Sequence, residues 1–117
     1  MTDRARRKAL TAAYKLAFPP MGIYAVRHLA TGRMLVDRSI NTTAALNRHR
    51  AELRLGLHRI RALQQEWNEQ GEAAFVFEVL EPVEEQADPA FDYDAELARR
   101  LQRWRERMPP GSEASYL

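Results

Sequence analysis

The stretch GIYAVRHLATGRMLVD, residues 22–37, decides the fold of this 117-residue chain. The run 23–29 is apolar, aromatic and rich in residues that favour strands. The pair Thr31-Gly32 follows as a turn, and a second apolar run occupies residues 33–36. The stretch therefore predicts a β-hairpin whose second strand is short.

Helices are predicted on both sides of this hairpin. Apolar residues three and four apart predict one from about Arg4 to Ala17, before the hairpin. After it, residues 41–43 offer N-caps for a helix to about Leu55, and another helix follows and stops at Gly71. The apolar stripes of these two later helices are predicted to be Leu46, His49, Leu53 and Leu57, then Ile60, Leu63 and Trp67.

The last third of the chain predicts one strand, one loop and one helix. Residues 73–83 alternate as a strand, with Phe75, Phe77 and Val79 on one side. An acidic, solvated loop is expected next, and then a helix over residues 92–108. Its buried face is predicted to hold Leu97, Leu101, Trp104 and Met108. This order of mixed elements around a hairpin indicates an α+β fold.

Composition excludes several classes of protein. A chain of this length forms one domain, here residues 20–117 preceded by a helix within residues 1–19. The absence of cysteine excludes disulfide scaffolds, thiolate zinc sites and thiol nucleophiles. No apolar run approaches the length of a membrane span, and the N-terminus lacks the apolar core of a signal peptide. We therefore expect a soluble cytoplasmic domain with no membrane partner.

Charge is distributed unevenly along the sequence. Residues 1–60 carry twelve basic and three acidic side chains, whereas residues 73–97 carry eight acidic side chains and no basic one. A basic region of this size suits a phosphate backbone. The same arginines can also be ordinary solvated surface charge, so charge alone leaves nucleic-acid binding open.

The sequence resembles the GIY-YIG nuclease superfamily, especially short stand-alone bacterial members with an extra N-terminal helix. The resemblance begins at the tripeptide Gly22-Ile23-Tyr24 and covers roughly residues 20–117. The further matching positions, in order and at family-like spacing, are Thr31, Gly32, Arg33, Ser39, Asn41, His49, Leu53, Gly56, His58, Leu63, Trp67, Gly71, Phe75 and Phe77. The resemblance implies a small three-stranded antiparallel sheet flanked by helices.

In active members of this family, one divalent metal ion helps to hydrolyse a phosphodiester. Such chemistry needs a base, a cation to neutralise the phosphate and a hard oxygen ligand for Mg²⁺ or Mn²⁺. The resemblance places Tyr24, His49 and His58 at three of the family's site positions. Its second tyrosine, its arginine and its metal-binding glutamate fall on Leu35, Ala45 and Leu101, which cannot do the same chemistry. This implies a degenerate site with no cofactor, in which Glu96 is a weak metal candidate.

Each candidate residue also has a purely structural interpretation. Tyr24 can be a core tyrosine with one hydrogen bond, and His49 can be a half-buried histidine within its helix stripe. His58 can be a surface residue near a helix start, where main-chain N–H groups also favour anions. Two histidines without a matched carboxylate make a zinc site improbable. Glu96 and Arg100 can form a helix surface pair.

Three functions follow from these observations. The first is a nuclease-like domain that binds nucleic acid, with DNA favoured, without efficient cleavage; the candidate contacts are Arg27, Arg50 and Arg54. The second is an active metal-dependent endonuclease that uses Tyr24, His49, His58 and Glu96 in a rearranged site. The third is a protein-interaction module that docks a basic partner on the acidic segment 73–97.

Overall fold

The computed structural model describes residues 19–117, so the helix predicted from about Arg4 to Ala17 lies outside the described residues. Within the described part, strands β1 (Met21–His28) and β2 (Met34–Ser39) form the predicted hairpin. Helices α2 (Thr42–Leu55) and α3 (Arg61–Gln70) follow. A single 3₁₀ turn, η1 (Glu72–Ala74), leads into β3 (Phe75–Val83), and α4 (Tyr93–Arg107) comes last. The predicted α+β class is confirmed.

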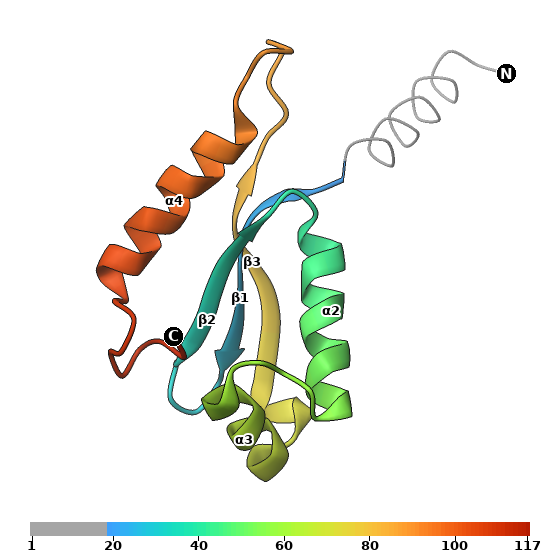
Figure 1. Cartoon of the computed structure of the whole chain (residues 1–117), viewed down its shortest axis with the longest axis vertical. Coiled ribbons are helices and arrows are strands. Elements are labelled where there is room, and N and C mark those ends of the chain that lie inside the picture. The colour runs from blue at the N-terminus through green and yellow to red at the C-terminus, as the bar shows by residue number, and fades with distance from the viewer. Residues whose placement is uncertain (1–18) are drawn as a thin grey trace, which may run out of the picture.

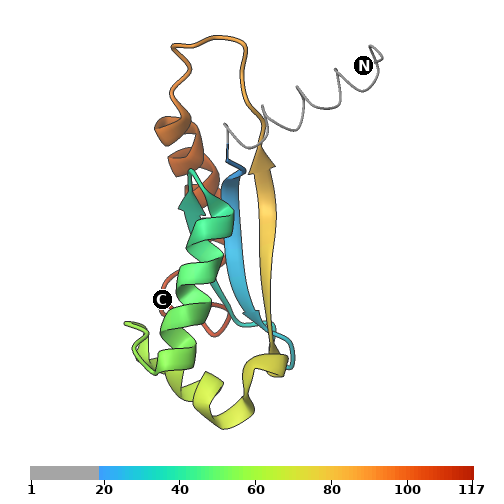
Figure 2. The same cartoon turned by 90° about the vertical axis from the view of Figure 1, so that its right-hand side faces the viewer.

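The three strands form one antiparallel sheet in the order β2-β1-β3. Because β1 is central, both of its faces are covered, and seven of its eight residues are buried. Helix α2 runs alongside the strands on one face (Figure 2), and α4 covers the other face (Figure 1). The sheet is thus the middle of three layers.

Apolar clusters fill the space between these layers, and alternate residues of β1 supply them. Val26 packs with Leu35, Leu53 and Trp67 on the face of α2 and α3, which we call the α2 face. Ile23 and Ala25 pack with Val36 and Leu101 on the opposite face, which we call the α4 face. Tyr24, between Ile23 and Ala25, therefore belongs to the α2 face.

The pairing of β1 with β3 contains a bulge beside Tyr24. Ile23 lies opposite Glu81, whereas Tyr24 lies opposite Val79, so Leu80 has no partner in the register. At the neighbouring Gly22, a Cβ atom would lie 2.1 Å from the main-chain oxygen of Glu81. Only glycine allows the two strands to approach so closely there.

Three details of the predicted elements were wrong. The second strand is not short, because it continues through residues 37–39. Leu57 is not part of the α2 stripe: Gly56 ends the helix in a left-handed conformation, and Leu57 is exposed. The third strand begins at Phe75 and not at Ala73, because η1 occupies Glu72–Ala74. Phe75, Phe77 and Val79 do share one side of this strand as predicted; the first two contact the ring of Trp67, and Val79 is exposed.

The remaining element predictions agree with the structure. Asn41 is the N-cap of α2, and its side chain accepts a hydrogen bond from the Ala44 N–H at 3.1 Å. Residues 84–92 form the predicted exposed acidic loop before α4, whose buried residues are Leu97 and Leu101. Among residues 19–117, no helix combines the length and apolarity needed to cross a membrane.

Candidate functional site

Tyr24 lies at an open cavity on the α2 face of the sheet. The side chain is 1% exposed, and its neighbour across the hairpin is Asp37. The cavity has a volume of roughly 370 Å³ and lies between β1, the end of β2 and the first two turns of α2. Its lining consists of Tyr24, Asp37, Arg38, Ser39, Asn41, Ala44, Ala45 and Arg48.

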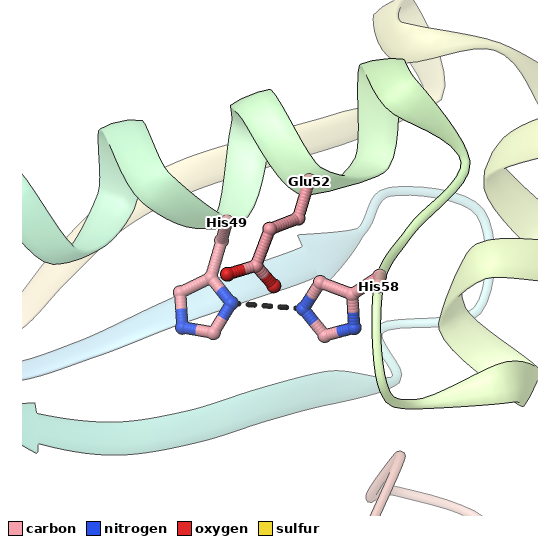
Figure 3. A group of neighbouring side chains, drawn as sticks. All are labelled: His49, Glu52 and His58. Atoms are coloured by element: carbon pink, nitrogen blue, oxygen red, sulfur yellow. Dashed lines mark hydrogen bonds between the residues drawn. The ribbon is translucent and has the colours of Figure 1, made fainter.

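A chain of short hydrogen bonds joins Tyr24 to both predicted histidines. The Tyr24 hydroxyl lies 2.8 Å from His49 Nε2, and His49 Nδ1 lies 2.8 Å from His58 Nε2. Figure 3 shows the two imidazole rings, one from α2 and one from the segment that follows it. His49 and His58 are 2% and 6% exposed, so the three residues meet in a region that is largely shielded from solvent.

The segment that carries His58 is held by Gln64 of α3. The Gln64 side chain accepts a hydrogen bond from the His58 main-chain N–H at 3.0 Å and donates one to the Leu53 carbonyl at 3.1 Å. These two bonds connect the end of α2 with the start of α3. They therefore fix the main chain of His58, which lies between the two helices.

Burial favours the neutral forms of these groups. It raises the pKa of Tyr24 to about 12. The charge of Asp37 raises this pKa further, whereas the guanidinium groups of Arg48 and Arg59 lower it. Burial also lowers the pKa of His49 to about 4, with further lowering by His58 and Arg48. The pKa of His58 is likewise lowered, mainly by burial. At neutral pH the site therefore holds a protonated phenol and two neutral imidazoles.

His49, Glu52 and His58 form a group that offers ligand atoms for a metal ion. One atom from each residue lies within 4.8 Å of the others, and the Glu52 carboxylate points toward both rings in Figure 3. Glu52 is thus the matched carboxylate that the sequence did not reveal. However, the two imidazole nitrogens that face each other already share the 2.8 Å hydrogen bond.

The positions where the family resemblance expected polar groups lie in different parts of the molecule. Ala45 lines the cavity, but Leu35 is fully buried in the apolar cluster of the α2 face. Leu101 packs on the α4 face with Ile23 and Ala25. A carboxylate at position 101 would therefore point away from Tyr24.

The other predicted site residues have partners of their own, away from the cavity. Arg27 pairs with Glu78 at 2.9 Å, and Arg54 pairs with Glu72 at 2.6 Å. The guanidinium of Arg50 stacks over the Phe77 ring. Glu96 is hydrogen-bonded to Arg99 and Arg100, which hold the pKa of its carboxyl at about 2. None of these four residues lines the Tyr24 cavity.

Sequence reasoning missed the arginines that do surround Tyr24. Arg48 lines the cavity, and its guanidinium and that of Arg59 act to lower the pKa of the Tyr24 hydroxyl, against the effect of burial. Arg48 directly precedes His49, so its place one turn beyond Ala45 was the available signal. Asp37 is likewise a cavity carboxylate that the sequence analysis did not single out.

Comparisons with known proteins show the fold. No family model matches the sequence, and no curated protein matches it either. The structure is similar to that of the catalytic domain of intron endonuclease I-TevI, determined as a point mutant, at 20% sequence identity and a TM-score of 0.61. That match covers 75% of this chain and 82% of the other.

A second solved structure, the catalytic domain of homing endonuclease I-TevI, gives the same result. It has 23% sequence identity and a TM-score of 0.59, and the match covers 74% of this chain and 86% of the other. The chain therefore has the GIY-YIG fold that the sequence predicted.

Proposed function

We propose that this chain is a nuclease-like domain that binds nucleic acid, DNA above all, without efficient cleavage. The fold is that of an endonuclease catalytic domain, and the Tyr24 cavity lies on its α2 face. The observation that carries the proposal is the composition of this cavity. It combines cationic and neutral hydrogen-bonding groups with aliphatic side chains at positions where catalysis would need polar ones.

The binding half of the proposal is supported by the cavity's donors. The guanidinium of Arg48 lines the same cavity as Tyr24, and Ser39 and Asn41 add polar atoms there. Arginine is well suited to phosphate because its planar guanidinium presents several N–H groups at once. A single nucleic-acid phosphate is therefore the ligand that we assign to this cavity.

The loss of efficient cleavage is supported by what faces Tyr24. Ala45 presents only a methyl group to the cavity, and the buried Leu35 cannot donate a hydrogen bond. Asp37 is the single carboxylate in the cavity lining. Within residues 19–117, the group of three potential ligands is His49, Glu52 and His58. It lies behind the cavity lining, to which it is connected by the hydrogen bond between His49 and Tyr24 and by the ion pair between Glu52 and Arg48 at 3.7 Å.

A second candidate function is an active endonuclease with a rearranged site. It is favoured by the presence of Arg48 and Asp37 beside Tyr24, since a cation and a carboxylate are two of the groups that metal-assisted hydrolysis requires. In that case Asp37, rather than Glu96, would be the ligand for Mg²⁺ or Mn²⁺.

The protein-interaction alternative has less in its favour. Four of the eight acidic side chains in segment 73–97 already pair with arginines of this chain: Glu78, Glu81, Asp94 and Glu96. Such internal pairing leaves a weaker surface for a basic partner.

Salt-titrated fluorescence anisotropy on labelled duplex, single-stranded and branched DNA, combined with a cleavage assay in Mg²⁺ and Mn²⁺, tests the proposal. The wild type is expected to bind with salt-dependent affinity and to leave the DNA intact. Arg48→Ala should reduce the slope of log affinity against log salt by about 0.9 on duplex DNA, because one phosphate contact is lost. Arg103→Ala, which changes an exposed arginine of α4, is the control and should leave the slope unchanged.

Two results would count against it. Metal-dependent cleavage by the wild type would favour the active endonuclease. Absence of salt-dependent binding to any of the three DNA forms would leave the nucleic-acid function without support.

A further inference from the structure

The main-chain amide of Ile60 determines which nitrogen of His58 carries the proton. The Ile60 N–H donates a hydrogen bond to His58 Nδ1 at 3.1 Å. A main-chain N–H can only donate, so His58 Nδ1 must be the unprotonated nitrogen. In a neutral imidazole the proton then lies on the other nitrogen, His58 Nε2.

The proton positions of His49 and Tyr24 follow from that of His58. His58 Nε2–H donates to His49 Nδ1 across their 2.8 Å contact, which leaves His49 with its proton on Nε2. His49 Nε2–H then donates to the Tyr24 oxygen, also at 2.8 Å. All three hydrogen bonds thus run in one direction, from Ile60 toward the cavity.

The Tyr24 oxygen is left with one unused hydrogen-bonding function. It accepts a hydrogen bond from His49, and that bond does not use the proton of the hydroxyl. His49 cannot accept the Tyr24 proton, because the facing Nε2 already carries one. That proton is therefore available to a group in the cavity that Tyr24 lines.

We propose that the Ile60 amide, acting through the positioning residues His58 and His49, holds Tyr24 as a hydrogen-bond donor to a phosphate oxygen. This inference rests on the proposed nucleic-acid function and gives Tyr24 a role in it that differs from that of a general base. A donor beside Arg48 suits an anionic oxygen, since hydrogen bonds to charged acceptors are stronger than neutral ones.

The charged groups around the two histidines are consistent with neutral rings. Glu52 on α2 and Asp37 on β2 favour a proton on His49, whereas Arg48, together with burial, opposes it. Around His58, Glu52 favours a proton, while Arg59 and Arg48 oppose it. Burial lowers the pKa of both rings, so at neutral pH both are neutral and the three hydrogen bonds keep their common direction.

A metal ion at His49, Glu52 and His58 is the competing use of this cluster. It would need lone pairs on both His49 Nδ1 and His58 Nε2, but the Ile60 bond leaves the second of these protonated. The two nitrogens are also 2.8 Å apart, whereas two imidazole ligands of a tetrahedral zinc ion, each about 2.1 Å from it, lie roughly 3.4 Å from each other. The hydrogen bond and the metal exclude each other here.

Long-range ¹H–¹⁵N correlation spectra of histidine-labelled full-length protein at pH 7 read the tautomers directly. We expect both His49 and His58 to be protonated at Nε2 and bare at Nδ1. His58→Gln should keep His49 in this form, because the glutamine amide can still donate. His58→Glu should move the His49 proton to Nδ1, because a carboxylate can only accept.

The spectra overturn the proposal if wild-type His58 is protonated at Nδ1 or at both nitrogens. Addition of Zn²⁺ at equimolar concentration provides a further arm. Unchanged histidine resonances would support the proposed direction of the three hydrogen bonds. Loss of the Nε2–H signal of His58, together with stabilisation of the fold, would identify a metal site instead. None of these readouts needs nucleic acid, so they stand even if the proposed function fails.

The phosphate arm compares Tyr24→Phe with Arg48→Ala in salt-titrated binding to a labelled DNA duplex. Tyr24→Phe should weaken binding about tenfold at every salt concentration without changing the slope, since a donor but no charge is lost. Equal affinity of Tyr24→Phe and the wild type, or no binding by the wild type, would overturn the assignment of a phosphate acceptor.

Discussion

The two faces of the sheet use the same central strand in different ways. On the α4 face, β1 contributes Ile23 and Ala25 to an apolar cluster that Leu101 seals. On the α2 face, the intervening Tyr24 opens the core to a chain of buried polar groups and to an arginine-lined cavity. Both faces hold apolar clusters, but only the α2 face also carries, at Tyr24, the cavity that we propose as the binding site. Substitutions at Leu101 and at this cavity should therefore have separable effects.

The largest effect is expected from a charge on the α4 face. Leu101→Glu should lower the free energy of unfolding by about 3 kcal/mol, because it places a carboxylate in a packed apolar cluster. It should not create metal-dependent cleavage, because position 101 faces away from Tyr24. Urea unfolding followed by circular dichroism measures the loss, and Leu101→Met is the control, with an expected cost below about 1.5 kcal/mol. A stable Leu101→Glu variant that cleaves DNA would show that the two faces are not separate.

The sequence predicts the elements of this fold better than it predicts which face of the sheet a side chain occupies. The hairpin, the later helices and the GIY-YIG fold could be predicted, since they depend on local periodicity, turn residues and a spaced motif. The face on which Leu101 lies could not, because α4 follows the irregular loop of residues 84–92, and the periodicity of a helix does not determine which face of the sheet it covers.

Some residues of the candidate site could be predicted from the sequence, and others could not. The family resemblance placed Tyr24, His49 and His58 at site positions, and the structure joins them by hydrogen bonds. Arg27, Arg50 and Arg54 were chosen for their charge, but each interacts with a side chain of this chain, which a charge count cannot show. Arg48 also pairs with a side chain of this chain, Glu52, at 3.7 Å, but it differs from the other three because it lines the Tyr24 cavity.

A smaller effect is expected from the acid titration of the α2 face. Burial lowers the pKa of folded His49 to about 4, whereas an unfolded histidine titrates near 6.5. Between these values the unfolded chain binds more protons, so stability is complete above about pH 6.5 and falls as the pH drops toward 4. The loss attributable to His49 should be on the order of 2 kcal/mol.

Urea unfolding at several pH values measures this dependence. His49→Gln is the matched variant, since it keeps a polar group but cannot titrate, and it should flatten the curve between pH 6.5 and 4. An equally steep curve for His49→Gln would assign the pH dependence to other groups and would remove the physical distinction between the two faces.

The smallest effect is expected from a charge removed at the cavity. Asp37→Asn should raise the affinity for duplex DNA about threefold at low salt, because it deletes a carboxylate that would repel a phosphate near Tyr24. The hydrogen bond that the Arg38 N–H donates to the Asp37 side chain at 2.8 Å can be kept by asparagine. Anisotropy measures the change, and Glu84→Gln in the acidic loop, which should have little influence, is the control. A weaker-binding Asp37→Asn variant would favour the active endonuclease, with Asp37 as a metal ligand.

The most direct test of the account is to map the bound duplex onto the two faces. In ¹H–¹⁵N spectra of the labelled protein titrated with a short DNA duplex, we expect the largest amide shifts in residues 37–48, around the Tyr24 cavity. The amides of residues 97–108 on α4 should stay nearly unchanged. Shifts concentrated on α4, or none at all at concentrations that saturate anisotropy, would contradict the claim that the α2 face binds nucleic acid.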